Sequence, residues 1–402
     1  MRVARVLRLA PRAQAALIAL SGGVLLGLSL LRLVPPWAAV AGSVLLALPM
    51  VARLSLVLGL GEAGRGLLVS RIVPGSPVEG YPVPVRLVLE SRSPLVWLLV
   101  DVVDSPPGDV PLLSSPRFRG VLLPGGEVRG QYYVAPRLGY RRMGPVTLRV
   151  YDLLGLYEAV VEVEPEGDAL VYALPSRQLA SRELRLLELE DPYTVPRARL
   201  IRREGTEIYT IREFQEGDEP RLIDWKATAR RGKLYVKELR RETYVPVLFV
   251  VAASPRSLEG PVFKTAFERL LRSIAALAED IISRDGTVGL LVAHTPPLAE
   301  PPLKAGEGLS RIYRLLGMAP LPAREPQGVV RLVTDYLRRH SPGRTTIVVA
   351  TDRQSLRAVW REMGVLAERK YRIYYLVADE SGTRLASHEA APSLAREGGA
   401  SG

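Results

Sequence analysis

Two long apolar stretches near the amino terminus constrain the fold of this chain more strongly than any other feature of its sequence. The first covers 13–31 and the second 33–52, and neither contains a charged residue. Each is about as long as the roughly 20 residues that a helix needs to cross a membrane. Pro35 and Pro36 lie near the start of the second stretch, where a helix can begin again after a tight turn. Residues 1–60 are therefore predicted to form two transmembrane helices.

Two alternatives are a helical hairpin buried in a soluble protein and a cleaved signal peptide. A buried hairpin in a soluble protein is disfavoured because neither stretch has a polar face. A signal peptide is disfavoured because the first apolar stretch is too long, no A-x-A-like site follows it, and a second apolar stretch comes at once. The transmembrane hairpin remains the preferred interpretation.

The arginines that flank these stretches predict their orientation. Before the first stretch lie Arg2, Arg5, Arg8 and Arg12, and after the second lie Arg53, Arg65 and Arg71. Only Arg32 lies between them. Because positive charge is enriched on the cytoplasmic side, both ends of the hairpin are expected there. We therefore expect a multi-pass protein of the cell membrane with cytoplasmic soluble domains.

Small residues indicate how the two helices approach each other. Gly23 and Gly27 form a G-x-x-x-G pair in the first stretch, and Ala38 and Gly42 provide small side chains in the second. Small residues let two helix backbones come close together in a membrane. We expect these residues to pack the two helices against each other, with dimerisation of two chains as the alternative.

Composition excludes several kinds of site. The chain has no cysteine, which excludes disulfides, thiolate metal sites, iron–sulfur clusters and cysteine nucleophiles. Its three histidines, His294, His340 and His388, are scattered, and no P-loop or Rossmann glycine pattern occurs. The net charge is +12, but residues 1–60 carry six arginines and no acid. Half of the basicity therefore flanks the apolar stretches and says little about nucleic acid.

Residues 61–175 show many short alternating segments separated by Pro-Gly and Gly-rich breaks, such as Pro124-Gly125-Gly126. This spacing is typical of an antiparallel β-sandwich of the immunoglobulin-like type. No catalytic constellation occurs in it, so we expect a rigid spacer or an interaction module.

Residues 176–245 are predicted to hold a linker helix at 181–190 and the most distinctive motif of the chain. Within the motif, 208–214 alternates like a strand and 216–220 has the composition of a turn. A short helix is expected to begin near Asp224, whose side chain suits an N-cap. The motif residues are Arg212, Gly217, Asp218, Arg221, Asp224, Trp225, Lys226 and Arg230.

This motif resembles the signature of the prokaryotic domain of unknown function 58 family. The signature's Arg-Glu-aromatic step, Gly-Asp pair and Arg-x-Ile-Asp-Trp-Lys run are present as Arg212-Glu213-Phe214, Gly217-Asp218 and Arg221-Leu222-Ile223-Asp224-Trp225-Lys226. A weaker resemblance is Gly144-Pro145-Val146 with Asp152-Leu153-Leu154-Gly155-Leu156. The resemblance implies a von Willebrand factor A-like domain at the carboxyl side and work beside an AAA+ ATPase of the MoxR type.

Two roles are open for the motif. In the first, its arginines and aspartates form a partly buried ion-pair network with Trp225 as the apolar anchor, since arginine binds carboxylates through two parallel hydrogen bonds. In the second, Arg221, Lys226, Arg230 and Arg231 form a surface that docks a partner or binds phosphate. No residue of the motif is nominated as a base or nucleophile.

Residues 246–380 alternate between buried strands and amphipathic helices, which predicts an open, mainly parallel α/β sheet with helices on both faces. The first strand is expected at 246–253 and the third at 345–350. The remaining 381–402 are rich in Ser, Ala and Gly and are expected to form a flexible tail.

The family resemblance implies the cation site of a von Willebrand factor A domain, in which an Asp-x-Ser-x-Ser motif and a distant aspartate hold a divalent cation. Here Ala252 replaces the first aspartate, Ser254 is retained, and Arg256 stands at the second serine's position. Asp352 is the candidate for the distant aspartate, or caps the next helix. Hard cations need several oxygen ligands, so we expect no metal and no cofactor.

These observations lead us to expect a membrane-anchored interaction or scaffold protein without enzymatic activity. The first alternative is a metal-dependent hydrolase or phosphotransferase that uses Asp352. The second is nucleic-acid binding through the arginines of 197–242, where 13 basic residues alternate with 9 acidic ones. Interspersed acids disfavour a phosphate-binding stripe, so no nucleic-acid partner is expected. The client complex and the oligomeric state stay open.

Overall fold

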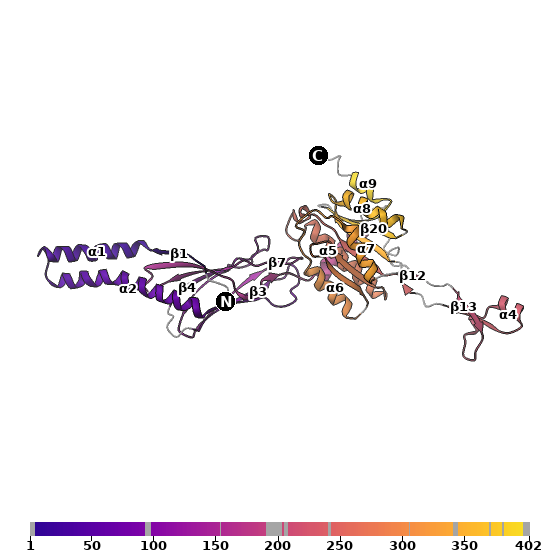
Figure 1. Cartoon of the computed structure of the whole chain (residues 1–402), viewed down its shortest axis with the longest axis horizontal. Coiled ribbons are helices and arrows are strands. Elements are labelled where there is room, and N and C mark those ends of the chain that lie inside the picture. Colours follow the sequence, from indigo (N-terminus) through magenta and orange to yellow (C-terminus); the bar gives the residue numbers. More distant parts are fainter. Residues whose placement is uncertain are drawn as a thin grey trace. The chain divides into compact units, whose positions relative to one another are not determined.

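The structure, a computed structural model, describes residues 5–92, 98–152, 154–189, 203–204, 208–239, 243–304, 306–340, 345–369, 371–379 and 382–396. Contacts divide the chain into two compact units, Met1–Leu174 and Pro175–Gly402 (Figure 1). The first unit contains the helical hairpin together with the β-rich region, and the second contains the motif and the α/β region.

Two antiparallel helices form the predicted hairpin. Helix α1 spans Ala13–Leu30 and α2 spans Trp37–Gly66. Both are long and apolar enough to cross a membrane. Helix α2 starts only after Pro35 and Pro36, because the two rings fix the backbone of the turn and remove two amide donors. It ends later than residue 52, since 54–60 continues the apolar helical pattern past Arg53.

The contact between α1 and α2 is built on different glycines than the sequence suggested. A Cβ atom on Gly22 would lie 2.8 Å from the carbonyl oxygen of Gly42, so the two backbones touch there. Gly42 and the buried Ala38 therefore lie in the interface as predicted. Gly23 and Gly27 do not, because a Cβ on either would meet nothing within 4 Å. The G-x-x-x-G pair faces away from α2.

The β-rich region of the first unit consists of two sheets that pack face to face. The first sheet has the order β1-β9-β8-β4-β5, formed by Arg5–Pro11, Tyr157–Val163, Val146–Tyr151, Leu98–Val103 and Arg117–Leu122. The second has the order β10-β2-β3-β6, formed by Glu166–Gly167, Leu67–Ile72, Val83–Ser91 and Glu127–Val134. A separate pair joins β7 Arg141–Arg142 to β11 Leu170–Val171. The immunoglobulin-like type of this β-rich region stays a prediction.

Strand β1 was not expected from the sequence. Residues 5–11 pair antiparallel with β9, and the register places Arg5 opposite Glu162 and Ala10 opposite Glu158. The arginines of this segment indicated only a basic flank, and its place as an edge strand comes from the pairing with the distant β9. The segment before the hairpin and the segment after it therefore belong to one sheet.

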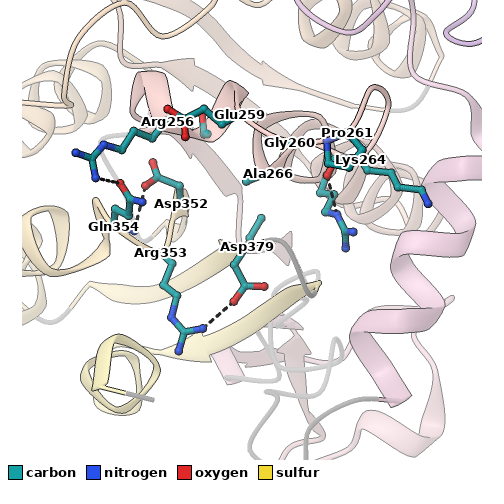
Figure 2. A pocket seen from close by; sticks show the side chains of 13 residues that line it. Arg256, Glu259, Gly260, Pro261, Lys264, Ala266, Asp352, Arg353, Gln354 and Asp379 are labelled. Carbon is teal, nitrogen blue, oxygen red and sulfur yellow. Dashed lines mark hydrogen bonds and ion pairs between the residues drawn. The ribbon is translucent and has the colours of Figure 1, made fainter. Parts of the chain in front are cut away.

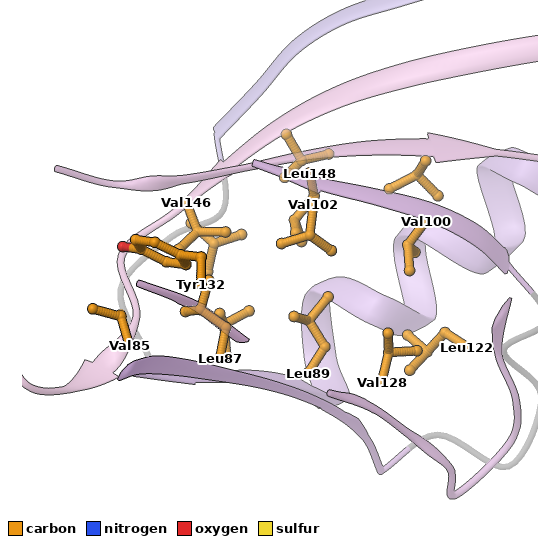
Figure 3. Packing of buried hydrophobic residues seen from close by; sticks show 14 of the residues in the cluster. Val85, Leu87, Leu89, Val100, Val102, Leu122, Val128, Tyr132, Val146 and Leu148 are labelled. Carbon is orange, nitrogen blue, oxygen red and sulfur yellow. The ribbon is translucent and has the colours of Figure 1, made fainter. Parts of the chain in front are cut away.

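Alternating side chains from both sheets fill a single apolar core. Val85, Leu87 and Leu89 of β3 lie opposite Val100 and Val102 of β4, and all five are buried (Figure 3). This period of two is what a half-buried antiparallel strand requires. Helix α2 takes part as well, because its Leu56 is fully buried in the same core.

One buried ion pair crosses this core. The guanidinium of Arg71 bonds both carboxylate oxygens of Asp104, and the Tyr132 hydroxyl donates to Asp104 at 2.7 Å. Arg71 also donates to the carbonyl of Gly144 at 2.7 Å. A Cβ on Gly144 would lie 2.8 Å from that of Ser105, so this position needs glycine. Gly144, which belongs to the weaker family resemblance, thus takes part in a polar contact between the two sheets.

The second unit is built on a six-stranded sheet of order β18-β17-β16-β19-β20-β21. These strands are Leu298–Leu303, Val288–Val292, Val247–Val251, Thr346–Asp352, Arg372–Ala378 and Thr383–Ser387. The four central strands are parallel and the two edge strands antiparallel. This confirms the mainly parallel sheet, while its assignment to the von Willebrand factor A type stays a prediction.

Helices cover both faces of this sheet. The apolar core on one face includes side chains of α7 Val329–His340, α8 Leu356–Glu368 and α9 Ala391–Arg396. Helix α5, Ala266–Ser283, contacts the sheet and in turn carries α3, Arg177–Leu189, and α6, Glu307–Gly317. Two-residue strands β12 Arg203–Glu204 and β15 Thr243–Tyr244 pair with each other.

The expected flexible tail from 381 is wrong for 383–396. Strand β21 pairs with β20 along five residues, and Leu385, Ala391 and Leu394 are buried. Composition suggested a tail because the segment is rich in small residues. In the structure these small residues form an edge strand and a short helix at one end of the core. The composition of the segment alone cannot reveal this packing.

Substituting neighbouring glycines of α1 tests the hairpin contact. We expect Gly22→Leu to lower the thermal unfolding temperature of the protein in detergent, because overpacking costs about 1–3 kcal/mol. Gly23→Leu is the matched control, since its side chain would enter open space. Equal effects of the two substitutions would contradict the contact described here.

Candidate functional site

The motif folds as a small hairpin with a helical insertion, which we call the motif hairpin (208–239). Strand β13, Ile208–Glu213, pairs antiparallel with β14, Tyr235–Leu239. Between them lie a turn, the 3-10 helix η2 at Pro220–Leu222 and helix α4 at Trp225–Arg231. The strand, turn and helix predicted for this segment are therefore present.

Arg212 and Asp218 close the turn of the motif hairpin. The guanidinium of Arg212 donates two hydrogen bonds to the Asp218 carboxylate, at 2.8 and 2.6 Å. The same carboxylate accepts the backbone N–H of Gln215 at 2.8 Å. Gly217 between them has a φ of 108°, a region that favours glycine. The bond from Arg212, followed by that from Gln215, holds the pKa of Asp218 below its usual value.

Asp224 starts helix α4 as the sequence predicted. Its carboxylate accepts the backbone N–H groups of Lys226 at 3.0 Å and Ala227 at 3.1 Å, which is N-cap geometry. These bonds, that from Ala227 first, lower the pKa of Asp224, with Lys237 adding to the effect. Gly232 ends the helix in the left-handed conformation with a φ of 70°.

The remaining motif residues face outward. Trp225 is 66% exposed, and Arg221, Lys226 and Arg230 are exposed as well. Trp225 is therefore not the apolar anchor of an ion-pair network. Within the described part of the chain, neither Arg221 nor Arg230 has an ion-pair partner. Arg212 pairs with Asp218, and Asp224 forms a more distant pair with Lys237 at 3.8 Å.

The motif thus divides into two sets of residues. Arg212, Gly217, Asp218 and Asp224 shape the motif hairpin. The other four are exposed on η2 and α4, and we call them together the outer face: Arg221, Trp225, Lys226 and Arg230. On α4, Lys226 and Arg230 are four residues apart and therefore lie on the same side of the helix, and Trp225 directly precedes Lys226.

Sequence reasoning missed three contacts that hold the motif hairpin. Lys233 lies 2.8 Å from Glu213 across the hairpin, Arg231 stacks over the ring of Tyr235, and the Thr228 hydroxyl accepts the Tyr235 N–H at 3.1 Å. The signal for the first is the antiparallel register of β13 with β14, whereas the other two place α4 against the start of β14. That register depends on the length of the insertion between the strands.

The second candidate site lies at the carboxyl ends of β16 and β19. These two strands are parallel neighbours, and the sheet is extended from them in opposite directions, by β17 and β18 next to β16 and by β20 and β21 next to β19. Ligands of open α/β sheets bind at such points. The structure brings Ser254 and Asp352 together there, and the backbone N–H of Ser254 donates to the Asp352 carboxylate at 2.7 Å. The other carboxylate oxygen accepts the N–H groups of Gln354 and Ser355 at 3.1 and 3.0 Å.

A cavity of about 600 Å³ adjoins Asp352. Its lining contains four basic side chains, those of Arg256, Lys264, Arg269 and Arg353. Figure 2 shows Arg256 turned toward Gln354 and Arg353 toward Asp379, and these contacts measure 3.1 and 3.0 Å. Glu259, Asp352 and Asp379 line the cavity too, so basic and acidic side chains are mixed beside Asp352.

These donors do not fit a divalent cation. Asp352 supplies one carboxylate, and both of its oxygens already accept backbone N–H groups. Among the residues that the structure describes, the buried hydroxyl oxygen of Ser254 has no hydrogen-bond partner, and Ser257 donates to the Ser254 carbonyl at 2.6 Å. In the parts of the chain that the structure describes, no three His, Cys, Asp or Glu side chains converge. Asp352 instead organises the turn before α8.

A family model matches the part of the chain that forms the motif hairpin and the six-stranded sheet. The family described as "Protein of unknown function DUF58" matches residues 210–387. This region belongs to the DUF58 family. The matched DUF58 region begins within β13 and ends at the last residue of β21, so it includes the motif hairpin and the whole six-stranded sheet. A search of curated proteins finds no match to the chain.

Asp218→Asn tests the closure of the turn in the DUF58 motif. The loss of charge weakens both bonds from Arg212, so we expect faster hydrogen–deuterium exchange in 213–220 and unchanged exchange in β19. Because the folded pKa of Asp218 is lowered, the pair stabilises the hairpin above the ordinary value of 3.8 and ceases to do so as the pH falls through the lowered pKa.

Glu216→Gln is the control for this experiment, since Glu216 is exposed in the same turn. If the two substitutions change exchange equally, the pairing of Arg212 with Asp218 does not shape the turn.

Asp352→Ala tests the structural role of Asp352 in the DUF58 region. Three backbone donors lose their acceptor, and each buried unsatisfied donor costs about 1–3 kcal/mol. We expect a lower unfolding temperature for the variant and no effect of added Mg²⁺ on the unfolding temperature of the natural chain. A clear stabilisation of the natural chain by Mg²⁺ that the variant lacks would show a cation site instead.

Proposed function

We propose that this protein is a membrane-anchored interaction protein whose outer face binds a partner protein. The observation that carries the proposal is the 66% exposure of Trp225 beside three exposed cations. Exposed tryptophan and arginine are the residues that contribute most to protein interfaces. A side chain of this size would be sequestered in a core if its role were to stabilise the motif hairpin.

The charges of the outer face indicate the chemistry of its partner. The exposed positions of η2 and α4 carry the basic side chains of Arg221, Lys226, Arg230 and Arg231 and no acidic side chain. Such a surface is complementary to an acidic surface with an apolar pocket for Trp225. The rigid turn beneath it, closed by Arg212 with Asp218, reduces the entropy lost on binding.

The family resemblance points to an AAA+ ATPase of the MoxR type as this partner. In this proposal the protein holds the ATPase near the membrane, where both act in the assembly or maturation of other complexes. Its contribution is binding and positioning, without catalysis. The bonds of Asp352 to three backbone N–H groups support this, because they leave its oxygens poorly placed to move protons or bind metal.

Two observations support a membrane location with cytoplasmic soluble domains. Strand β1 before the hairpin and β9 after it lie in one sheet, which requires both ends of the hairpin to be on the same side of the bilayer. The arginines at those ends favour the cytoplasmic side. The outer face and an ATPase in the cytoplasm are then in the same compartment.

The test is recovery of the purified MoxR-type ATPase of the source organism by the full-length protein in detergent. We expect the triple substitution Arg221→Gln, Trp225→Ala and Arg230→Gln to weaken binding by about tenfold or more, since loss of one hot-spot residue costs about 2 kcal/mol. Asp224 is left unchanged because it caps α4.

Arg338→Gln with Arg339→Gln is the control, because both arginines are exposed on α7. Unchanged recovery of the ATPase by the folded triple variant would contradict docking through the outer face. Binding to anionic lipid vesicles that only the triple variant loses, with ATPase recovery unaffected, would assign the outer face to lipid instead.

A further inference from the structure

The hairpin is too short to cross a bilayer if its lipid-facing part ends at Arg53. From Trp37 to Arg53 an α-helix rises about 24 Å, at roughly 1.5 Å per residue. The hydrocarbon core is about 30 Å thick. Continuing the helix to Leu58 brings the rise to about 32 Å. The missing length is supplied if the part of α2 between Arg53 and Leu58 lies in lipid too.

One exposed side of α2 is apolar over that whole length. Trp37, Val40, Val44, Val51, Leu54 and Leu58 recur at spacings of three, four or seven, and each is at least 56% exposed. They form one stripe along the helix, and no charged residue stands in it. We call it the α2 stripe. It continues past Arg53 without interruption.

The β-sandwich begins within the same length of α2. Leu56 is buried in the sandwich core, and a Cβ on Gly59 would lie 2.9 Å from the Leu98 side chain of β4. One side of α2 thus packs on the sandwich while the α2 stripe stays exposed on another side. Lipid that covers the stripe to Leu58 therefore reaches the level of the sandwich.

The turn between β8 and β9 lies at this level. Leu156 packs against Ala15 of α1 and Ala52 of α2, and its carbonyl accepts the Arg12 N–H at 2.9 Å. Asp152 holds the turn by accepting the backbone N–H groups of Leu154 and Tyr157, at 2.8 and 2.6 Å. Leu154 is held in place in this way and is 53% exposed.

We propose that the membrane-proximal end of the β-sandwich is immersed in the bilayer surface, with Leu54, Leu58 and Leu154 in contact with lipid acyl chains. The partner of this surface is the bilayer that already surrounds the α2 stripe. Arg53 extends its charged end to the headgroups, as long basic side chains do at this depth. The Arg12 guanidinium instead donates to the Gly155 carbonyl of the turn at 3.3 Å. This inference rests on the membrane anchoring that forms part of the proposed function.

The competing arrangement is a bilayer that thins around a short hairpin and leaves the sandwich in water. The two arrangements differ in the environment of positions 58 and 154. The chain has no cysteine, so a single spin label can be attached at any chosen position of the full-length protein. We choose Leu58→Cys and Leu154→Cys, with Val44→Cys as the lipid reference and Tyr133→Cys as the water reference. All four side chains are exposed.

The measurement compares collisions of each label with oxygen, which concentrates in lipid, and with a polar nickel chelate, which stays in water. The protein is reconstituted in vesicles of dioleoylphosphatidylcholine. We expect the oxygen-to-nickel ratio at 58 and 154 to approach that at 44 and to exceed that at 133 several-fold.

Ratios at 58 and 154 equal to that at 133, with a lipid-like ratio at 44, would overturn the immersion while leaving the anchoring intact. A water-like ratio at 44 would overturn both the anchoring and the immersion. The loss of the high ratio at 154 in Asp152→Ala, with position 44 unchanged, would further support the role of the turn in presenting Leu154 to lipid.

Discussion

The pairing of β1 with β9 is the constraint on which the arrangement of the first unit depends. One sheet receives a strand from before the hairpin and a strand from after it. The two helices are thereby tied to the sandwich at both ends, and the Arg12 N–H bonded to Leu156 extends this tie into the first residue before α1. Leu56 adds an apolar contact from α2 to the same core. A hairpin held in this way is a base for the soluble part and has little freedom to tilt independently of it.

The motif of the DUF58 region combines two physical roles that a sequence signature does not separate. Arg212, Gly217 and Asp218 form a turn whose bonds are internal, and Asp224 begins α4. Trp225 follows Asp224 directly in sequence, yet its side chain is left in solvent. Because the N-cap fixes the first turn of the helix, it also fixes the direction in which Trp225 and Lys226 project. The proposed binding surface is therefore a consequence of the same bonds that fold the motif hairpin.

Local patterns were sufficient to predict the elements but not the partners of many residues. The apolar stretches, the strand at 247–251 and the N-cap at Asp224 follow from periodicity and side-chain chemistry, and the structure contains all three. Gly22 could not be separated from Gly23 by composition, because only the rotation of α1 decides which glycine meets Gly42. Strand β1 and the segment at 383–396 depend on distant strands for their pairing. The exposure of Trp225 was likewise unpredictable, since a tryptophan beside an N-cap suits a core and an interface equally well.

The most direct test of the account is the side of the membrane on which each part of the chain lies. Single cysteines can be placed in β1, in the turn between the helices and on α4 with Leu9→Cys, Leu33→Cys and Trp225→Cys, because the natural chain has none. These cysteines are then exposed to a membrane-impermeant maleimide in intact bacterial cells that produce the protein. The account predicts labelling at 33 in intact cells and at 9 and 225 only after the membrane is opened. Labelling of 9 and 225 from opposite sides, or of both from outside, would contradict it.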